Sequence, residues 1–104
     1  MNVVGPVTPA EQEYLLSCAK QGADLMRALS HEGRLLICCH LLTGERSVGE
    51  LETLLEMRQS AVSQQLARLR QDGIVAARRD GKTIWYSLAS GRAHALLAKM
   101  HEFF

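Results

Sequence analysis

The sequence lacks the features that mark membrane, secreted and disordered proteins. Its longest uncharged apolar run, Leu35 to Leu42, is far shorter than the roughly 20 residues that span a bilayer. No proline-rich or glycine-serine tract marks a linker, and residues 1–8 carry neither a basic residue nor the apolar core of a targeting signal. A chain of 104 residues that is 47% hydrophobic is long enough for one core. We therefore expect a single cytoplasmic domain spanning residues 1–104, with no membrane partner.

Cysteine is scarce, and the residue patterns of catalysis are missing. Cys18, Cys38 and Cys39 do not make a disulfide framework, and a reducing compartment would keep them as thiols. There is no Ser-His-Asp arrangement, no carboxylate pair suited to acid-base chemistry and no glycine-rich phosphate loop. We therefore expect that the chain is not an enzyme and that it binds no cofactor. Any role of the cysteines should be redox or ligand chemistry.

The net charge of +1 is small, but the charge is distributed unevenly along the chain. Residues 1–57 hold four basic and eight acidic side chains, a balance of −4. Residues 58–82 hold six basic and two acidic side chains, a balance of +4. Segment 58–82 is therefore the expected electrostatic face of the molecule, and a positive face suits a polyanionic partner.

Two helices are predicted in the first half. Thr8-Pro9 followed by acidic residues is typical of a helix start, and apolar positions continue at helical spacing to about Ser30. A second helix is predicted over about 32–43, ending at Gly44. Because this segment is apolar nearly all round, it should be the most buried element.

Two further helices and a hairpin should follow. Ser47 and Glu50 have the spacing of a capping box, which predicts a short helix and a break near Met57. The next helix is expected over about 59–71, ending at Asp72-Gly73. The pattern then alternates as in strands over 74–79 and 83–88, with a two-residue turn predicted at Asp80-Gly81. Ser90 should cap a last helix that runs from residue 91 to the end.

This order of elements is that of a mainly α winged helix-turn-helix with a β-hairpin wing. The second helix of such a motif fits the major groove of DNA, and the hairpin reaches the phosphates or the minor groove beside it. Isolated from its neighbours, a polar helix face is most often merely solvated, but the adjacent basic hairpin favours DNA binding. The residues predicted to contact DNA from the helix are Arg58, Gln59, Ser60, Ser63, Gln64, Gln65 and Arg68, and those from the hairpin are Arg78, Arg79 and Lys82. Arg68 and Arg70 point to different helix faces, so one of them should be an ordinary surface charge.

Four segments make the chain similar to a known family. They are LSHEGRLLI at 29–37, SVGEL at 47–51, SAVSQQLARLR at 60–70 and RDGKTIWY at 79–86. With them the chain resembles ArsR/SmtB repressors over nearly its whole length, and most of all the persulfide- and redox-sensing SqrR/BigR/HlyU branch. The resemblance implies a homodimer built on the first and last helices, repression by operator binding, and release when a ligand or oxidant reaches the protein.

The metal-ligand patterns of that family are missing. Its metal-sensing members place a Cys-x-Cys motif in the first helix of the helix-turn-helix, where residues 50–55 hold no cysteine. Other members use an Asp and a His two apart in the last helix with a second His about eleven further on, whereas His94 and His101 are seven apart. Histidines at this spacing share one helix face, but an isolated pair is more often exposed than bound to zinc. No metal site is therefore predicted.

The resemblance assigns a sensing role to Cys39. Persulfide-sensing members use a cysteine five residues after the arginine of an Arg-Leu motif, and Arg34 places that position at Cys39. Their second cysteine, at the end of the last helix, would fall one position beyond Phe104. The alternative for Cys39 is a small buried hydrophobic residue with a raised pKa. Cys38 should pack in the core, and Cys18 could offer another partner thiol.

The sequence thus predicts a DNA-binding repressor that releases its operator when reactive sulfur species or oxidants modify Cys39. Two alternatives stay open. One is a repressor that senses a metal ion or has no inducer site in these residues. The other is a protein-interaction module that does not bind DNA.

Overall fold

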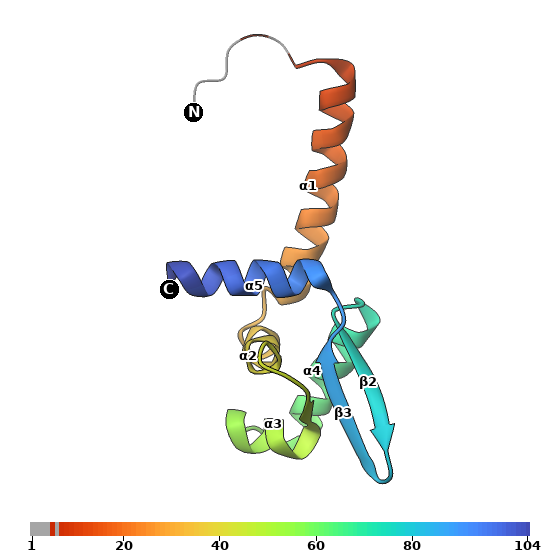
Figure 1. Cartoon of the computed structure of the whole chain (residues 1–104), viewed down its shortest axis with the longest axis vertical. Coiled ribbons are helices and arrows are strands. Elements are labelled where there is room, and N and C mark those ends of the chain that lie inside the picture. Colours follow the sequence, from red (N-terminus) through yellow and green to blue (C-terminus); the bar gives the residue numbers. More distant parts are fainter. Residues whose placement is uncertain (1–4, 6) are drawn as a thin grey trace.

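The computed structural model describes Gly5 and residues 7–104, and its elements follow the predicted winged helix-turn-helix order. Most of the segment predicted to lack a targeting signal, residues 1–8, lies outside the described residues. The elements in chain order are α1 (Pro9–Leu29), α2 (Glu32–Leu41), β1 (Arg46–Ser47), α3 (Val48–Leu55), α4 (Gln59–Gln71), β2 (Val75–Asp80), β3 (Thr83–Leu88) and α5 (Gly91–Phe103). The fold class predicted from the sequence is confirmed, mainly helical with a β-hairpin (Figure 1).

Side-chain caps fix where the helices begin. The Thr8 hydroxyl accepts a hydrogen bond from the Glu11 backbone N–H, and the Glu11 carboxylate accepts one from the Thr8 N–H. Ser47 and Glu50 make the same reciprocal pair at the start of α3. These capping boxes satisfy N–H groups that have no partner within a helix. The helix starts predicted from Thr8 and Ser47 are confirmed.

The helix ends match the prediction at α4 and differ at α2. After α4, Gly73 adopts a φ of +74°, and the Ile74 N–H bonds to the Leu69 carbonyl, which is the Schellman arrangement that glycine favours. The α2 helix ends at Leu41, two residues before the predicted end. The reason is a tightening of the last turn, where the Leu42 N–H bonds three residues back to the Cys39 carbonyl.

The sheet contains a strand that the pattern did not predict. β1 is only two residues long, too short for any periodicity, and it pairs with β3 so that the strand order is β1-β3-β2. In the hairpin, β2 begins one residue later than predicted, and Asp80 pairs with Thr83. The two-residue turn is therefore Gly81-Lys82 rather than Asp80-Gly81. Of these two turn residues, only Gly81 has a positive φ, of 63°, which corresponds to a turn with glycine in its first position.

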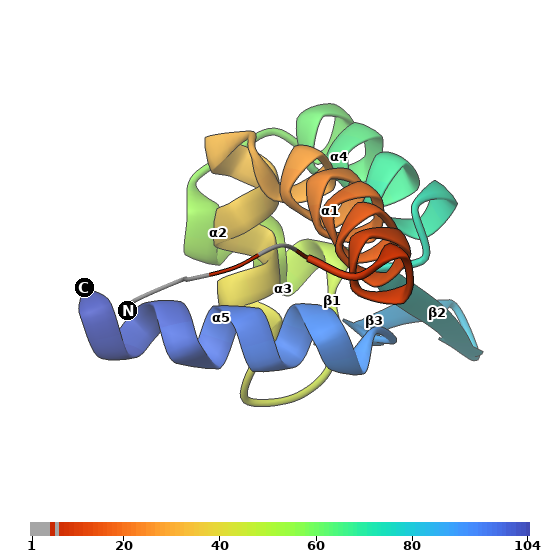
Figure 2. The same cartoon turned by 90° about the horizontal axis from the view of Figure 1, so that it is seen from above.

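One hydrophobic core joins α2, α3, α4 and the base of the hairpin. Ile37, Leu51 and Leu66 are fully buried in it, together with Leu97 from α5. Because four of the ten residues of α2 are buried, the largest share of any element, its prediction as the most buried element is confirmed. The wing projects from one corner of this body, and α5 runs across α2 (Figures 1 and 2).

The α1 helix lies largely outside this core. It rises away from the body, and only its last two residues, Ala28 and Leu29, are buried (Figure 1). Most of its predicted apolar stripe is exposed in the single chain, with Leu15 at 51% and Met26 at 62% exposure. The guanidinium of Arg34 holds the end of α1 by donating to the Ala28 carbonyl at 2.7 Å. No helix in the described part of the chain is both long and apolar enough to cross a bilayer.

Candidate DNA-binding surface and sensor thiol

The geometry of the helix-turn-helix starts from the buried face of α4. Val62, Leu66 and Leu69 are all completely buried, and they fix the rotation of the helix about its axis. The connection from α3 is a tight turn in which Glu56 adopts a left-handed conformation with a φ of 52°. Because these constraints direct one face of α4 inward, its opposite face must point to solvent.

The polar residues predicted to read DNA lie on the outer side of α4. Apart from Arg68, which is described below, four of them are exposed and the remaining two are half-buried at the flanks. Ser60 and Gln64, one turn apart, lie on the face opposite Leu66. The exposed residues are Arg58, Gln59, Ser60 and Gln64, and the half-buried ones are Ser63 and Gln65. Their contact with bases stays a prediction.

Sequence reasoning missed one residue of this face. Gln71 is exposed and lies seven residues after Gln64, which is nearly two full helical turns along the same side. The signal was present in the sequence as the seven-residue interval between two glutamines. Ala67, also exposed, lies between them, so an exposed strip extends along the length of α4.

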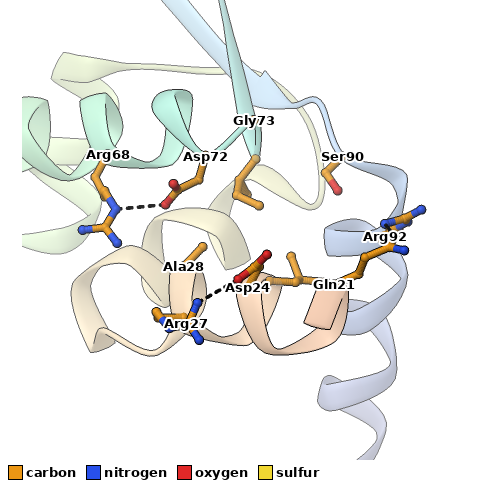
Figure 3. A pocket seen from close by; sticks show the side chains of 11 residues that line it. Gln21, Asp24, Arg27, Ala28, Arg68, Asp72, Gly73, Ser90 and Arg92 are labelled. Atoms are coloured by element: carbon orange, nitrogen blue, oxygen red, sulfur yellow. Dashed lines mark hydrogen bonds and ion pairs between the residues drawn. The ribbon is translucent and has the colours of Figure 1, made fainter. Parts of the chain in front are cut away.

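Arg68 differs from the other predicted contacts in its surroundings. Its Nε donates to the Asp72 carboxylate at 2.9 Å, and its side chain lines a cavity of about 440 Å³ between α1, α4 and α5 (Figure 3). Arg27, which pairs with Asp24, and Arg92 line the same cavity. Arg68 lies one turn beyond Gln64, at the edge of that exposed face, and its pairing with Asp72 and its place in the cavity draw its side chain toward α1.

The wing carries three cations with different surroundings. Arg78 makes two hydrogen bonds to the Glu45 carboxylate, at 2.9 and 3.0 Å, and this pairing lowers the pKa of Glu45. Arg79 and Lys82 are exposed, and no carboxylate of residues 7–104 lies within 4.0 Å of either. The strand register places Arg79 opposite Ile84 and Arg78 opposite Trp85, so the two arginines lie on opposite faces of the hairpin.

The three thiols lie in three different environments. Cys38 is completely buried, as predicted, and burial raises its pKa to about 12. Cys18 is exposed on α1, one turn from Tyr14. Cys39 is half-buried, and burial raises its pKa as well. All three are free thiols.

Cys39 faces the end of the last helix, as the resemblance predicted. Its Sγ lies 3.2 Å from Nε2 of His101, which is 62 residues away on α5. Sequence reasoning considered His101 only as a possible metal ligand with His94 and missed this contact. No pattern along one helix could have revealed it, because the two residues meet through packing of α5 against α2. Within the described residues, no cluster of three or more metal-ligating side chains occurs.

A helix-turn-helix with a basic hairpin beside it defines a winged-helix transcription regulator, a class of DNA-binding proteins rather than enzymes. Comparison with known proteins agrees, because the model of the bacterial regulatory protein, arsR family, matches residues 31–77. Two relatives are similar over most of the chain. The transcriptional activator HlyU of Vibrio cholerae is 45% identical over 80 residues, which cover 77% of this chain and 74% of that protein. The biofilm growth-associated repressor of Agrobacterium fabrum is 45% identical over 86 residues, covering 83% of this chain and 74% of that protein.

A solved structure, reduced HlyU from Vibrio cholerae, has a similar fold. It superposes with a TM-score of 0.84 and 39% sequence identity over 88% of this chain and 97% of that chain. The chain belongs to the arsR family of bacterial regulatory proteins. It is a winged-helix transcription regulator, and the family resemblance predicted from its sequence is confirmed.

Proposed function

We propose that this chain is a homodimeric transcriptional repressor of the cytoplasm, which binds double-stranded operator DNA and releases it when a reactive sulfur species or an oxidant modifies Cys39. One observation carries the proposal. The Cys39 thiol contacts α5, a helix that is expected to form the dimer. This contact is separate from the outer face of α4. Chemistry at the thiol therefore has a route to the DNA-binding surface through the dimer.

The outer face of α4 and the wing support operator binding. Ser60 and Gln64 present hydrogen-bonding groups that suit base edges in a major groove. Arg79 and Lys82 are exposed cations that suit phosphates, which would contribute affinity without sequence information. One named relative is a repressor and another an activator, so we assign repression on the sequence resemblance and make it part of the test.

The exposed faces of α1 and α5 support a homodimer. Tyr14 and Leu16 on α1 are 69% and 62% exposed, and Phe103 on α5 is 74% exposed. Large apolar side chains on two helices form the kind of surface that protein–protein interfaces cover. A symmetric dimer would also present two copies of α4 to two operator half-sites.

The end of α5 that lies against Cys39 carries no thiol within these 104 residues. A persulfide on Cys39 can form a polysulfide or disulfide bridge only if a second thiol lies near Phe104. Without such a thiol, modification should stop at a single adduct, which must still be accommodated between α2 and α5. From such a single adduct we expect DNA release to be partial or absent, because α5 is not cross-linked to α2.

The test is operator binding before and after treatment with a small persulfide donor. The original chain should lose affinity, whereas Cys39→Ser should retain it. Cys18→Ser, which removes an exposed thiol on α1, is the matched control and should respond like the original chain. Equal loss of DNA by the original chain and Cys39→Ser would show that Cys39 is structural.

Two further readouts separate the remaining alternatives. Binding to a duplex that weakens as salt rises supports DNA recognition, since displaced counterions follow phosphate contacts. Salt-independent binding would favour a protein-interaction module instead. Transcription from an operator-bearing promoter in the presence of the untreated protein should fall, and a rise would make the chain an activator.

A further inference from the structure

Cys39 and His101 form a sulfur–imidazole pair between two helices. Sγ of Cys39 and Nε2 of His101 lie 3.2 Å apart, within the range of a hydrogen bond that involves sulfur. In the imidazole tautomer that carries its proton on Nδ1, Nε2 is an acceptor and the thiol donates to it. The pair thus has the arrangement of a nucleophile beside a base.

The surroundings of Cys39 supply little other help to ionise the thiol. Burial acts on its pKa and raises it, which disfavours the thiolate that reacts. The segment within one turn of Cys39 along α2 contains no lysine or arginine. A reactive Cys39 therefore needs a group from another element to take its proton, and His101 is within reach.

We propose that His101 is the catalytic base of the sensor, taking the proton from the Cys39 thiol as its sulfur attacks a persulfide or a disulfide. This inference rests on the proposed sensing role of Cys39. His101 is exposed, so its ring is open to solvent while its Nε2 faces the half-buried sulfur. A base in this position could exchange its proton with the leaving group or with water.

The step balances with a persulfide RSSH as the only co-reactant. His101 accepts the thiol proton, and the Cys39 sulfur attacks the outer sulfur of RSSH. The S–S bond of the donor breaks, and a new S–S bond forms on Cys39. The imidazolium then gives its proton to the departing RS⁻. The products are a Cys39 persulfide and RSH, so the donor's sulfane sulfur has been transferred and no other oxidant is required.

The test measures the rate at which Cys39 is modified, by mass spectrometry, under a fixed excess of glutathione persulfide at neutral pH. His101→Gln keeps a polar side chain of similar reach but removes the base. The rate should fall about tenfold or more, because positioned proton transfer contributes at least this much. His94→Gln, on the same helix and also exposed, is the matched control and should react at the original rate.

Chemical rescue distinguishes a base from a structural contact. In His101→Ala, added imidazole should restore much of the lost rate, whereas it should leave the rate of the original chain unchanged. A normal rate in His101→Gln would overturn the inference. A slow rate that imidazole does not restore would also overturn it, since His101 would then only support the local structure.

The two proposals fail separately. The modification rate of Cys39 is measured without DNA, so it reports on His101 even if Cys39→Ser still releases the operator on treatment. In that case the sensing function fails while the role of His101 at the thiol stands. Conversely, if His101→Gln is modified at the normal rate and releases DNA normally, the proposed role of His101 as a base is refuted. The proposed sensing role of Cys39 is then still supported.

Discussion

The wing arginine Arg78 is bound at two points by Glu45, a residue 33 positions earlier in the loop before β1. The two hydrogen bonds, at 2.9 and 3.0 Å, use both carboxylate oxygens. Because a guanidinium held in this way has its charge largely compensated, Arg78 is less available to a phosphate than its neighbours on the hairpin.

Removing that carboxylate should strengthen DNA binding. Glu45→Gln removes the closer carboxylate of Arg78 and leaves only Asp80 at 3.9 Å, so affinity for operator and random duplex should rise together and the salt slope should steepen by up to about one unit. Fluorescence anisotropy over a salt series measures both quantities. Glu13→Gln on α1 makes the same charge change away from the wing and is the control. Unchanged affinity in Glu45→Gln would mean that Arg78 stays away from DNA.

The three wing cations should not contribute equally. Arg79→Ala and Lys82→Ala should each weaken binding to every duplex and lower the salt slope by about one unit. Arg78→Ala should have a smaller effect, because its charge is already paired with Glu45. The same salt series measures this order. Equal slopes for Arg79→Ala, Lys82→Ala and the original chain would show that the hairpin does not touch DNA.

A base-reading role for α4 predicts a loss confined to the operator. Gln64→Ala should cost roughly 1–3 kcal/mol against the operator and little against random duplex, because a glutamine can bond an adenine edge at two points. Competition binding with the two duplexes measures the difference. Gln12→Ala, an exposed glutamine on α1, should change neither affinity. Equal losses on both duplexes would contradict a base-reading role for Gln64.

The thiols should react with iodoacetamide in a fixed order. Cys18 should be alkylated first because it is exposed, then Cys39, while Cys38 should stay unreacted until the protein unfolds. Peptide mass mapping at intervals, with and without denaturant, gives the order, and early labelling of Cys38 would refute its burial.

The stability of the protein should fall at high pH because of the same burial. The pKa of Cys38 in the folded chain lies above its unfolded value. The contribution of the buried thiol to the free energy of unfolding is therefore complete below pH 9 and is lost as pH rises toward about 12.

The turn of the helix-turn-helix stores backbone strain at Glu56. A non-glycine residue in the left-handed region costs roughly 1–2 kcal/mol, and glycine loses roughly 0.5–1 kcal/mol through its greater freedom in the unfolded chain. Glu56→Gly should therefore stabilise the protein by about 0.5–1 kcal/mol. Urea unfolding at one fixed protein concentration measures this change. Destabilisation would indicate that the Glu56 side chain supports the turn.

The predicted elements succeeded where the deciding interactions are local in sequence. The Thr8 and Ser47 caps, the glycine stop after α4 and the inner face of α4 each involve residues of one short segment. The differences between the predicted and observed elements also concern short segments. The two-residue β1 has no repeat to detect, and the hairpin turn shifted by one residue because Gly81 takes the first turn position.

The sequence by itself determined the helix boundaries to within two residues, the winged fold, the family and the polar face of α4. Only the tertiary structure decided which charged and reactive groups meet. The Glu45–Arg78 pair spans 33 residues and the Cys39–His101 pair spans 62. The periodicity of a helix or strand specifies which face a side chain occupies, but not which distant element packs against that face. The positions of these pairs follow from how the core orients α2, α5 and the hairpin relative to one another.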